Sequence, residues 1–284
     1  MLGSANGALL SPSAESLAGR IAYLELPALS VSEVPAKDHT ALWVRGGFPL
    51  SLMAGSDAAS LRWRQSFIST CLERDIPQLG PRIPALTLRR LWTMHAHEQG
   101  QLVQASKLAA SLAISAQTVA RYIDVLCDVM LVRRLQAWAS NGGKRLVRSP
   151  KIVVRDSGLV HALLGLRTLD DVLAHPVAGG SWEGLVIENL IGAAPWGTQV
   201  SFYRSAGGAE ADLVLEFSAQ QRWAIEIKRS SAPTVSRGFH VAADDLHATR
   251  RIVVHGGTEA FRMGSGVEAL PLPLLMSQLR EVHS

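Results

Sequence analysis

Two runs of alternating apolar residues within positions 210–229 constrain the fold of this 284-residue chain most strongly. Successive side chains of a β-strand point to opposite faces, so each run predicts a strand with one apolar face. A slip of one residue would turn one apolar set into solvent, so the two strands should pair with odd-numbered residues beside odd-numbered ones. The apolar residues that define this register are Leu213, Leu215 and Phe217 in the first strand and Trp223, Ile225 and Ile227 in the second.

The even-numbered positions then share the other face of this predicted hairpin. They bring Asp212, Glu226 and Lys228 together, with Glu210 and Glu216 nearby. Two neighbouring carboxylates resist ionisation unless a cation compensates them, and Mg²⁺ takes oxygen ligands of this kind. A lysine beside the ion could orient an attacking water or neutralise charge on a phosphate. The alternative is a solvated polar strand face, which is common in proteins.

A helix expected over about 181–193 could supply one more carboxylate to such an ion. Its two candidates are Glu183 and Glu188, which lie five positions apart and therefore on somewhat different faces of the helix. The hypothesis takes Asp212, Glu226 and Lys228 as catalytic residues, and Glu183, Asp212 and Glu226 as ligands of Mg²⁺.

Residues 85–155 predict three helices followed by a β-hairpin. The helices are expected over about 85–98, from Ser106, and from Ser115, which is a good N-cap residue. Two β-rich runs follow at 132–138 and 144–156, and the sequence ASNGG between them favours a turn. This order of elements is typical of a winged helix-turn-helix.

This winged helix is a candidate nucleic-acid interface. The third helix would expose Gln117 and Arg121, whose side chains can contact phosphates and base edges. The wing region is strongly basic and could contact several phosphates. The basic residues there are Arg133, Arg134, Lys144, Arg145, Arg148, Lys151 and Arg155, and the hypothesis assigns Lys144, Arg145 and Arg148 to nucleic-acid binding. The alternative is a protein-docking module with a solvated basic face.

The remaining pattern predicts an α/β domain. Strands are expected at 199–204, 210–217, 222–229 and 250–255, with a helix before the last of them and a helix and an apolar loop in the tail. We therefore expect an α/β fold, α+β overall, with a mixed central sheet, divided into residues 1–40, 41–165 and 166–284.

Composition excludes several classes of protein. Hydrophobic residues make up 48% of the chain, as in a folded protein, and the formal net charge of +4 is only mildly basic. Two cysteines cannot form a disulfide framework or a four-ligand zinc site, so we expect a cytoplasmic protein. No apolar run is long enough for a membrane span, and no GxxxxGK[ST] loop is present.

Six stretches carry a family resemblance across residues 41–230. Asp212 and the Glu226-Ile227-Lys228 triplet, after an acidic helix, resemble the core of PD-(D/E)xK nucleases. The chain more specifically resembles the module called domain of unknown function 4143, which implies a restriction-endonuclease-like domain after a winged helix. The matching stretches are RGGFP (45–49), LERDI (72–76), KIVVRDSGLVHALLG (151–165), WEGLVIENL (182–190), GAEADLVLE (208–216) and AIEIKRS (224–230).

In the resembled family this module follows an AAA-type ATPase core. Residues 3–34 resemble the last strand and the lid of that core, and the phosphate-binding loop should lie upstream of Gly3. We therefore expect a truncated member of the family that does not bind ATP by this route, with Arg20 in a structural role.

Two functions follow as hypotheses. The first is a DNA-associated protein with a metal-dependent, nuclease-like site that hydrolyses phosphodiesters. The second is a non-catalytic module that binds DNA or a protein through the winged helix and keeps only a vestigial nuclease fold. A third possibility is a fragment without activity of its own.

Overall fold

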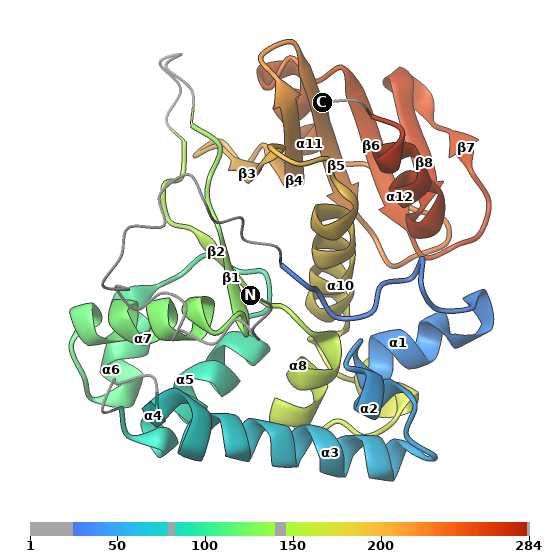
Figure 1. Cartoon of the computed structure of the whole chain (residues 1–284). Helices are drawn as coiled ribbons and strands as arrows, with labels where there is room; N and C mark the ends of the chain where they lie inside the picture. Colours follow the sequence, from blue (N-terminus) through green and yellow to red (C-terminus); the bar gives the residue numbers. More distant parts are fainter. Residues whose placement is uncertain (1–24, 79–82, 140–145, 283–284) are drawn as a thin grey trace, which may run out of the picture.

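A computed structural model describes residues 25–78, 83–139 and 146–282. The molecule has a helical half, at the bottom of Figure 1, and a half built around a β-sheet, at the top right. Helix α10 (Ala178–Ala193) runs from one half into the other. One hydrophobic core extends through both halves, since it includes Trp92 of the helical half and Leu190, Leu213 and Leu275 of the other. The expected mixture of helix and sheet is therefore confirmed.

The helical half comes first in the sequence. The expected helices over 85–98, from Ser106 and from Ser115 are confirmed as α5, α6 and α7, and the Ser115 hydroxyl accepts a hydrogen bond from the Thr118 amide. The segments of this half are η2 (Ala36–Asp38), α1 (His39–Arg45), α2 (Pro49–Leu52), α3 (Asp57–Thr70), the π-helical turn η3 (Cys71–Asp75), α4 (Ile76–Gln78), α5 (Ala85–His97), α6 (Ala105–Leu112), α7 (Ala116–Asp128), α8 (Ser157–Leu163) and α9 (Leu169–Ala174).

A two-stranded antiparallel sheet follows α7. Strand β1 (Val132–Leu135) pairs with β2 (Lys151–Val154), so both strands are shorter than the sequence predicts. Beyond them the chain leaves this pairing and contacts strand β3 (Gln199–Arg204): the Trp138 amide donates to the Phe202 carbonyl, and the Val147 amide to the Arg204 carbonyl. We call residues 136–139 and 146–150, which follow β1 and precede β2, the arm, and in Figure 1 it rises beside β3. The arm therefore covers an edge strand, and the predicted turn at 139–143 lies mostly outside the described residues.

The main sheet has six strands in the order β3-β4-β5-β6-β8-β7. Strands β3, β4 and β5 pair antiparallel, β5, β6 and β8 pair parallel, and β7 pairs antiparallel with β8. The strands expected around 199, 210, 222 and 250 are confirmed, whereas the tail, expected as a helix and an apolar loop, also contains β7 and β8. The remaining bounds are β4 (Glu210–Ser218), β5 (Gln221–Ile227), α11 (Arg237–Asp245), β6 (Arg250–His255), β7 (Phe261–Arg262), η4 (Gly264–Gly266), β8 (Val267–Pro271) and α12 (Leu272–Arg280).

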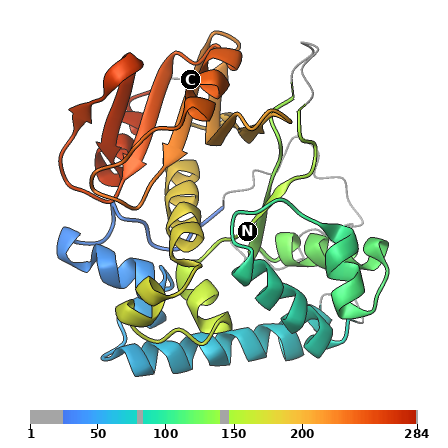
Figure 2. The ribbon, with the colours of Figure 1, turned by 180° about the vertical axis from the view of Figure 1, so that it is seen from behind.

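Helices cover both faces of this sheet. Helices α10 and α12 pack on one face, where Leu213 and Ile225 join the main core. Helix α11 packs on the other, where Val214 and Ala224 form a second core with Phe239. Figure 2 shows the arrangement from behind. The even-numbered face of the hairpin is therefore largely buried, which makes the solvated-face alternative wrong for its central positions.

The family resemblance predicts that residues 1–40 are a remnant of an ATPase core and its lid. Residues 1–24, Arg20 among them, lie outside the described part of the chain. In the segment that follows, the Leu29 amide donates to the Gly47 carbonyl and the Val31 amide to the Asn189 side chain. This segment therefore joins the helical half to α10. Among the described helices, none has both the length and the hydropathy that a bilayer crossing requires.

Candidate functional site

The register of the β4–β5 hairpin is the one that the apolar pattern predicts. Leu213 lies opposite Ile225 and Leu215 opposite Trp223, and all four side chains are buried. Burial of both odd-numbered sets on the α10 face fixes this register, because a shift by one residue would place charged side chains in the core.

The start of β4 departs from regular alternation. Between Ser201 and Tyr203 the partner positions on β4 move from Val214 to Ala211, so three steps on β4 match two on β3. Ala211 and Val214 accordingly belong to the same core, although residues three apart in a regular strand face opposite sides. Asp212 lies within this β-bulge, and a bulge redirects a side chain relative to the strand around it.

The bulge directs Asp212 to a buried ammonium group. Lys151 Nζ lies 3.5 Å from Asp212 Oδ1, 3.3 Å from Glu183 Oε1 and 3.2 Å from Glu210 Oε1. The side chain of Lys151 is only 3% exposed. We call Glu183, Glu210, Asp212 and Glu226 the carboxylate cluster. Three of its members, from α10 and β4, thus surround a lysine that belongs to β2.

The predicted Glu-x-Lys pair at the end of β5 lies beside this arrangement. Lys228 Nζ is 2.6 Å from Glu226 Oε1, and the Glu226 side chain is buried. The Ile227 amide donates a 2.9 Å hydrogen bond to Asp212 Oδ2, which ties β5 to the bulge of β4. The structure therefore brings together Asp212, Glu226 and Lys228, which the sequence hypothesis makes catalytic, and places Glu183 at the same lysine as Asp212.

The cluster carries more negative charge than its neighbours compensate. Desolvation, followed by the charge of Asp212, raises the pKa of Glu183 to about 8 and that of Glu226 to about 7. Burial alone would lower the pKa of Lys151, but the charges of Glu183, Asp212 and Glu210 raise it above its usual value. Carboxyl groups that retain protons near neutral pH gain free energy from an added cation. The cluster is therefore short of positive charge.

Carboxylate oxygens are the ligands that Mg²⁺ and Mn²⁺ prefer, so Glu183, Asp212 and Glu226 fit a divalent cation in kind. As the side chains stand, however, no three carboxylate, imidazole or thiol groups in the described part of the chain are arranged to hold a metal ion. The Lys151 ammonium lies instead against one oxygen of Glu183 and one of Asp212, where a metal ion would bind.

Glu188, the other candidate on α10, lies elsewhere. Its carboxylate binds the guanidinium groups of Arg133 and Arg155, and both arginines also contact Glu25. Five positions along a helix turn a side chain well away from Glu183, and the β1–β2 arginines take up the second carboxylate. Glu188 therefore joins the helical half to α10 and is not part of the cluster.

The predicted nucleic-acid residues are described only in part. Gln117, Arg121 and Arg148 are exposed, whereas Lys144 and Arg145 lie outside the described residues. The other four basic residues of the expected wing are paired with acids: Arg133 and Arg155 with Glu188, Arg134 with Asp124, and Lys151 with the carboxylate cluster. These four basic residues therefore join parts of the fold.

Two residues of the site were missed from the sequence. Lys151 appeared there as a phosphate contact of the wing, and Glu210 only as a neighbour of Asp212. The three apolar residues that follow Lys151, in the run KIVV, are the one available signal, because all four positions of β2 are buried. A buried lysine requires carboxylate partners, and nothing in the sequence identifies which ones.

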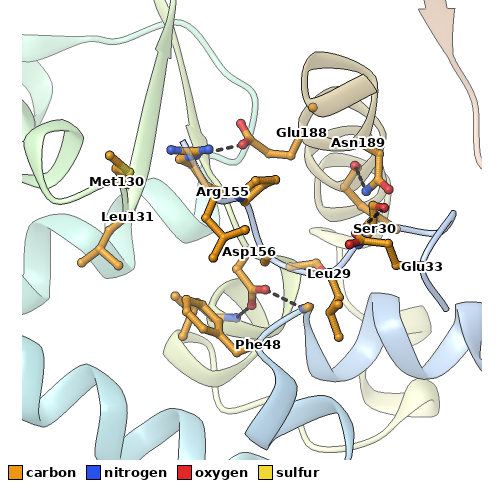
Figure 3. A pocket seen from close by; sticks show the side chains of 18 of the residues that line it. Leu29, Ser30, Glu33, Phe48, Met130, Leu131, Arg155, Asp156, Glu188 and Asn189 are labelled. Atoms are coloured by element: carbon orange, nitrogen blue, oxygen red, sulfur yellow. Dashed lines mark hydrogen bonds and ion pairs between the residues drawn. The ribbon is translucent and has the colours of Figure 1, made fainter. Parts of the chain in front are cut away.

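A cavity of about 440 Å³ lies apart from the cluster. Figure 3 shows Leu29, Phe48, Met130 and the paired Arg155 and Glu188 around it. Its lining includes none of the cluster residues and is mainly apolar. The cavity therefore lies where the 25–33 segment, the helical half and α10 meet, and it is not part of the site predicted at Asp212 and Glu226.

Comparisons with known proteins divide the chain at nearly the same place as the fold. A family model described as Domain of unknown function (DUF8612) matches residues 36–170, and one described as Domain of unknown function (DUF4143) matches residues 178–275. The resemblance to family 4143 is thus shown for the sheet half, whereas a different model covers the helical half that the sequence analysis had included in it.

Uncharacterized proteins of Mycobacterium tuberculosis and Mycobacterium bovis are each 44% identical to the chain over 281 residues. The alignment covers 98% of this chain and 62% of each relative, so the chain spans about three fifths of the length of the curated relatives it matches. No solved structure matches the chain.

Proposed function

We propose that the carboxylate cluster is the site of a divalent-cation-dependent phosphodiester hydrolase that acts on nucleic acid. The observation that carries this proposal is the convergence of Glu183, Asp212 and Glu226, from three separate elements, in one largely buried cluster, with the partly exposed Lys228 beside Glu226. Titratable groups with strongly shifted pKa values gather at functional sites more often than elsewhere. A six-stranded mixed sheet with helices on both faces supports the nuclease-like fold that the resemblance implies.

Each residue has a distinct role in this proposal. Glu183, Asp212 and Glu226 would hold Mg²⁺ or Mn²⁺, which supplies a Lewis acid for a phosphoryl oxygen and lowers the pKa of a bound water. Lys228 is 41% exposed and lies against Glu226, so its ammonium can contact a phosphate from the solvent side. The Ile227 amide holds Asp212 in orientation.

The substrate class rests on the exposed groups of the helical half. Gln117 and Arg121 lie exposed on α7, and Arg148 is exposed on the arm that contacts β3. Side chains of these types bind phosphates and base edges. We further propose that the ATPase core implied by the family resemblance belongs to the part of the longer relatives that this chain does not span.

A cleavage assay tests the catalytic proposal. Plasmid and single-stranded DNA are incubated with the chain and Mg²⁺ or Mn²⁺, and with the variants Asp212→Asn and Lys228→Met. We expect each variant to lose at least about 100-fold in rate, as is typical when a catalytic acid, base or charge-stabilising group is removed. Asp244→Asn is a matched control, because Asp244 is 64% exposed in the same half and pairs only with the surface residue Arg251 in the contacts described.

Cleavage that persists unchanged in both Asp212→Asn and Lys228→Met would show that the activity belongs to another protein or another site. Cleavage that also disappears in Asp244→Asn would point to general loss of structure, which circular dichroism of the three variants checks.

The position of Lys151 favours a second candidate, a binding module without catalysis. In that function Lys151 is a permanent replacement for the metal, and the cluster only stabilises the fold. DNA binding without cleavage, measured by fluorescence anisotropy and weakened by Arg121→Glu and Arg148→Glu, would support it. Such binding should also weaken steeply with salt, because phosphate contacts release counterions.

A further inference from the structure

Strand β2 delivers Lys151 into the carboxylate cluster from the helical half of the molecule. Its ammonium group lies 3.2–3.5 Å from oxygens of Glu183, Glu210 and Asp212, and 5.4 Å from the centre of the Phe202 ring. Hence these partners of the ammonium belong to α10 or to the sheet half, whereas its backbone belongs to the small sheet after α7.

The backbone around Lys151 is held by the loop that follows α5. The Ile152 amide donates to the Gln101 carbonyl, and the Gln99 side chain both donates to the Val154 carbonyl and accepts from the Val154 amide. This loop also packs against Glu183: a Cβ at Gly100 would lie 3.1 Å from Glu183 Oε1. The helical half therefore positions both the lysine and one wall of the cluster.

A lysine ammonium and a divalent cation cannot occupy this place together. Mg²⁺ lies about 2.0–2.1 Å from its oxygen ligands. An ion bound by Glu183 and Asp212 would lie close to the Lys151 ammonium, which is 3.3 and 3.5 Å from an oxygen of each of these carboxylates. Two cations so close repel each other strongly in a site with little water.

We propose that Lys151 is a built-in competitor of the divalent cation, and that the ion enters the carboxylate cluster only when Lys151 withdraws. This inference rests on the proposed function, since it requires that the cluster bind an ion at all. It makes loading of the site depend on the contact between β2 and the sheet half. The described conformation is then the closed, inactive form of the site.

The accessibility of Lys151 in the unmodified chain tests the inference. Lysines are acetylated briefly with an amine-reactive ester, with and without saturating Mn²⁺, and the modified peptides are quantified by mass spectrometry. We expect labelling of Lys151 to rise at least about fivefold with Mn²⁺, because a side chain that is 3% exposed must leave the cluster. Lys107, which is 56% exposed, is the internal control and should not change.

Mn²⁺ affinity, measured by the paramagnetic resonance signal of free Mn²⁺, separates the outcomes. Lys151→Met should bind Mn²⁺ at least about tenfold more tightly than the unmodified chain, since a competing charge has been removed, while Lys107→Met should bind as the unmodified chain does. Binding to Lys151→Met alone would also support the inference. If Lys151→Met does not fold, the acetylation experiment decides by itself.

Two results would overturn the inference, and they differ in what else they overturn. Mn²⁺ binding at the cluster, abolished by Asp212→Asn, with Lys151 still protected from acetylation would refute the competition and leave the proposed hydrolase intact. Failure of both the unmodified chain and a folded Lys151→Met variant to bind Mn²⁺ would refute the proposed function as well.

Discussion

The substitution Glu188→Gln probes how the two halves of the molecule are joined. Glu188 on α10 is 12% exposed, and its carboxylate accepts hydrogen bonds from Arg133 and from Arg155, the latter at 2.8 Å. The amide of glutamine keeps the shape but removes the negative charge. Two guanidinium groups that are mostly buried would then share only the more exposed carboxylate of Glu25.

The expected loss of stability can be estimated from this geometry. Removal of one partner of a buried ion pair costs about 3–5 kcal/mol. Because Glu25 still compensates part of the charge, we expect about 2–3 kcal/mol for Glu188→Gln. Asp124→Asn is the matched control. Asp124 pairs with Arg134, which lies on β1 next to Arg133, but Asp124 is 53% exposed, so removal of its charge should lower the free energy of unfolding by about 1 kcal/mol at most.

Urea unfolding followed by tryptophan fluorescence measures the difference. With a denaturant dependence of about 2–3 kcal/mol per molar urea, Glu188→Gln should lower the midpoint by about 1 M, and Asp124→Asn by much less. Equal shifts for the two variants would refute the reasoning from burial. Loss of Mn²⁺ binding in a folded Glu188→Gln protein would contradict its placement outside the carboxylate cluster.

Three further predictions concern polar groups of different burial. Burial lowers the pKa of His161 from 6.5 to about 4, so the buried neutral imidazole favours the folded state above pH 6.5. About 3 kcal/mol of the free energy of unfolding is then lost as the pH falls toward 4. The urea midpoints at pH 7 and pH 4.5 should therefore differ less in His161→Gln than in the unmodified chain. Asp156→Ala leaves the buried Gly47 and Leu159 amides without an acceptor and should lower the free energy of unfolding in urea by about 2–4 kcal/mol. The control Ser115→Ala, at the exposed cap of α7, should lower it by about 1 kcal/mol. Equal losses in the two variants would contradict the role given to burial. Lys228→Met should change the free energy of unfolding by about 1 kcal/mol at most, because the Lys228 ammonium is partly exposed. A larger loss in urea unfolding would show that Lys228 has a structural role.

Local patterns identified most elements of the fold because each depends on periodicity or on a cap. The helix from Ser115 begins where its hydroxyl caps the Thr118 amide, and the hairpin pairs Leu213 with Ile225 as the apolar alternation requires. Strand β8 was missed because its run VEALP is short and passes directly into the apolar start of α12. Parallel pairing with β6 stabilises it, and such long-range pairing leaves no local signal.

The candidate site was predictable only in part. The hairpin register predicted Asp212 on the same face as Glu226 and Lys228, and the helix before the hairpin offered Glu183 and Glu188. The β-bulge that redirects Asp212 depends on three steps of β4 matching two of β3, a mismatch that exists only once the strands pair. The choice between Glu183 and Glu188 was likewise made by packing, since Arg133 and Arg155 approach α10 only in the folded chain.

The sequence by itself determined which residues can form strands and helices and which carboxylates share a hairpin, because those properties follow from the spacing of apolar and polar side chains along one segment. Only the tertiary structure decided what compensates the carboxylates. Lys151 is about sixty residues from Asp212 in the chain, yet its ammonium lies 3.5 Å from that carboxylate. Burial makes a cation obligatory at such a cluster, and the packing of β2 against the sheet half supplies a lysine where the sequence predicted Mg²⁺.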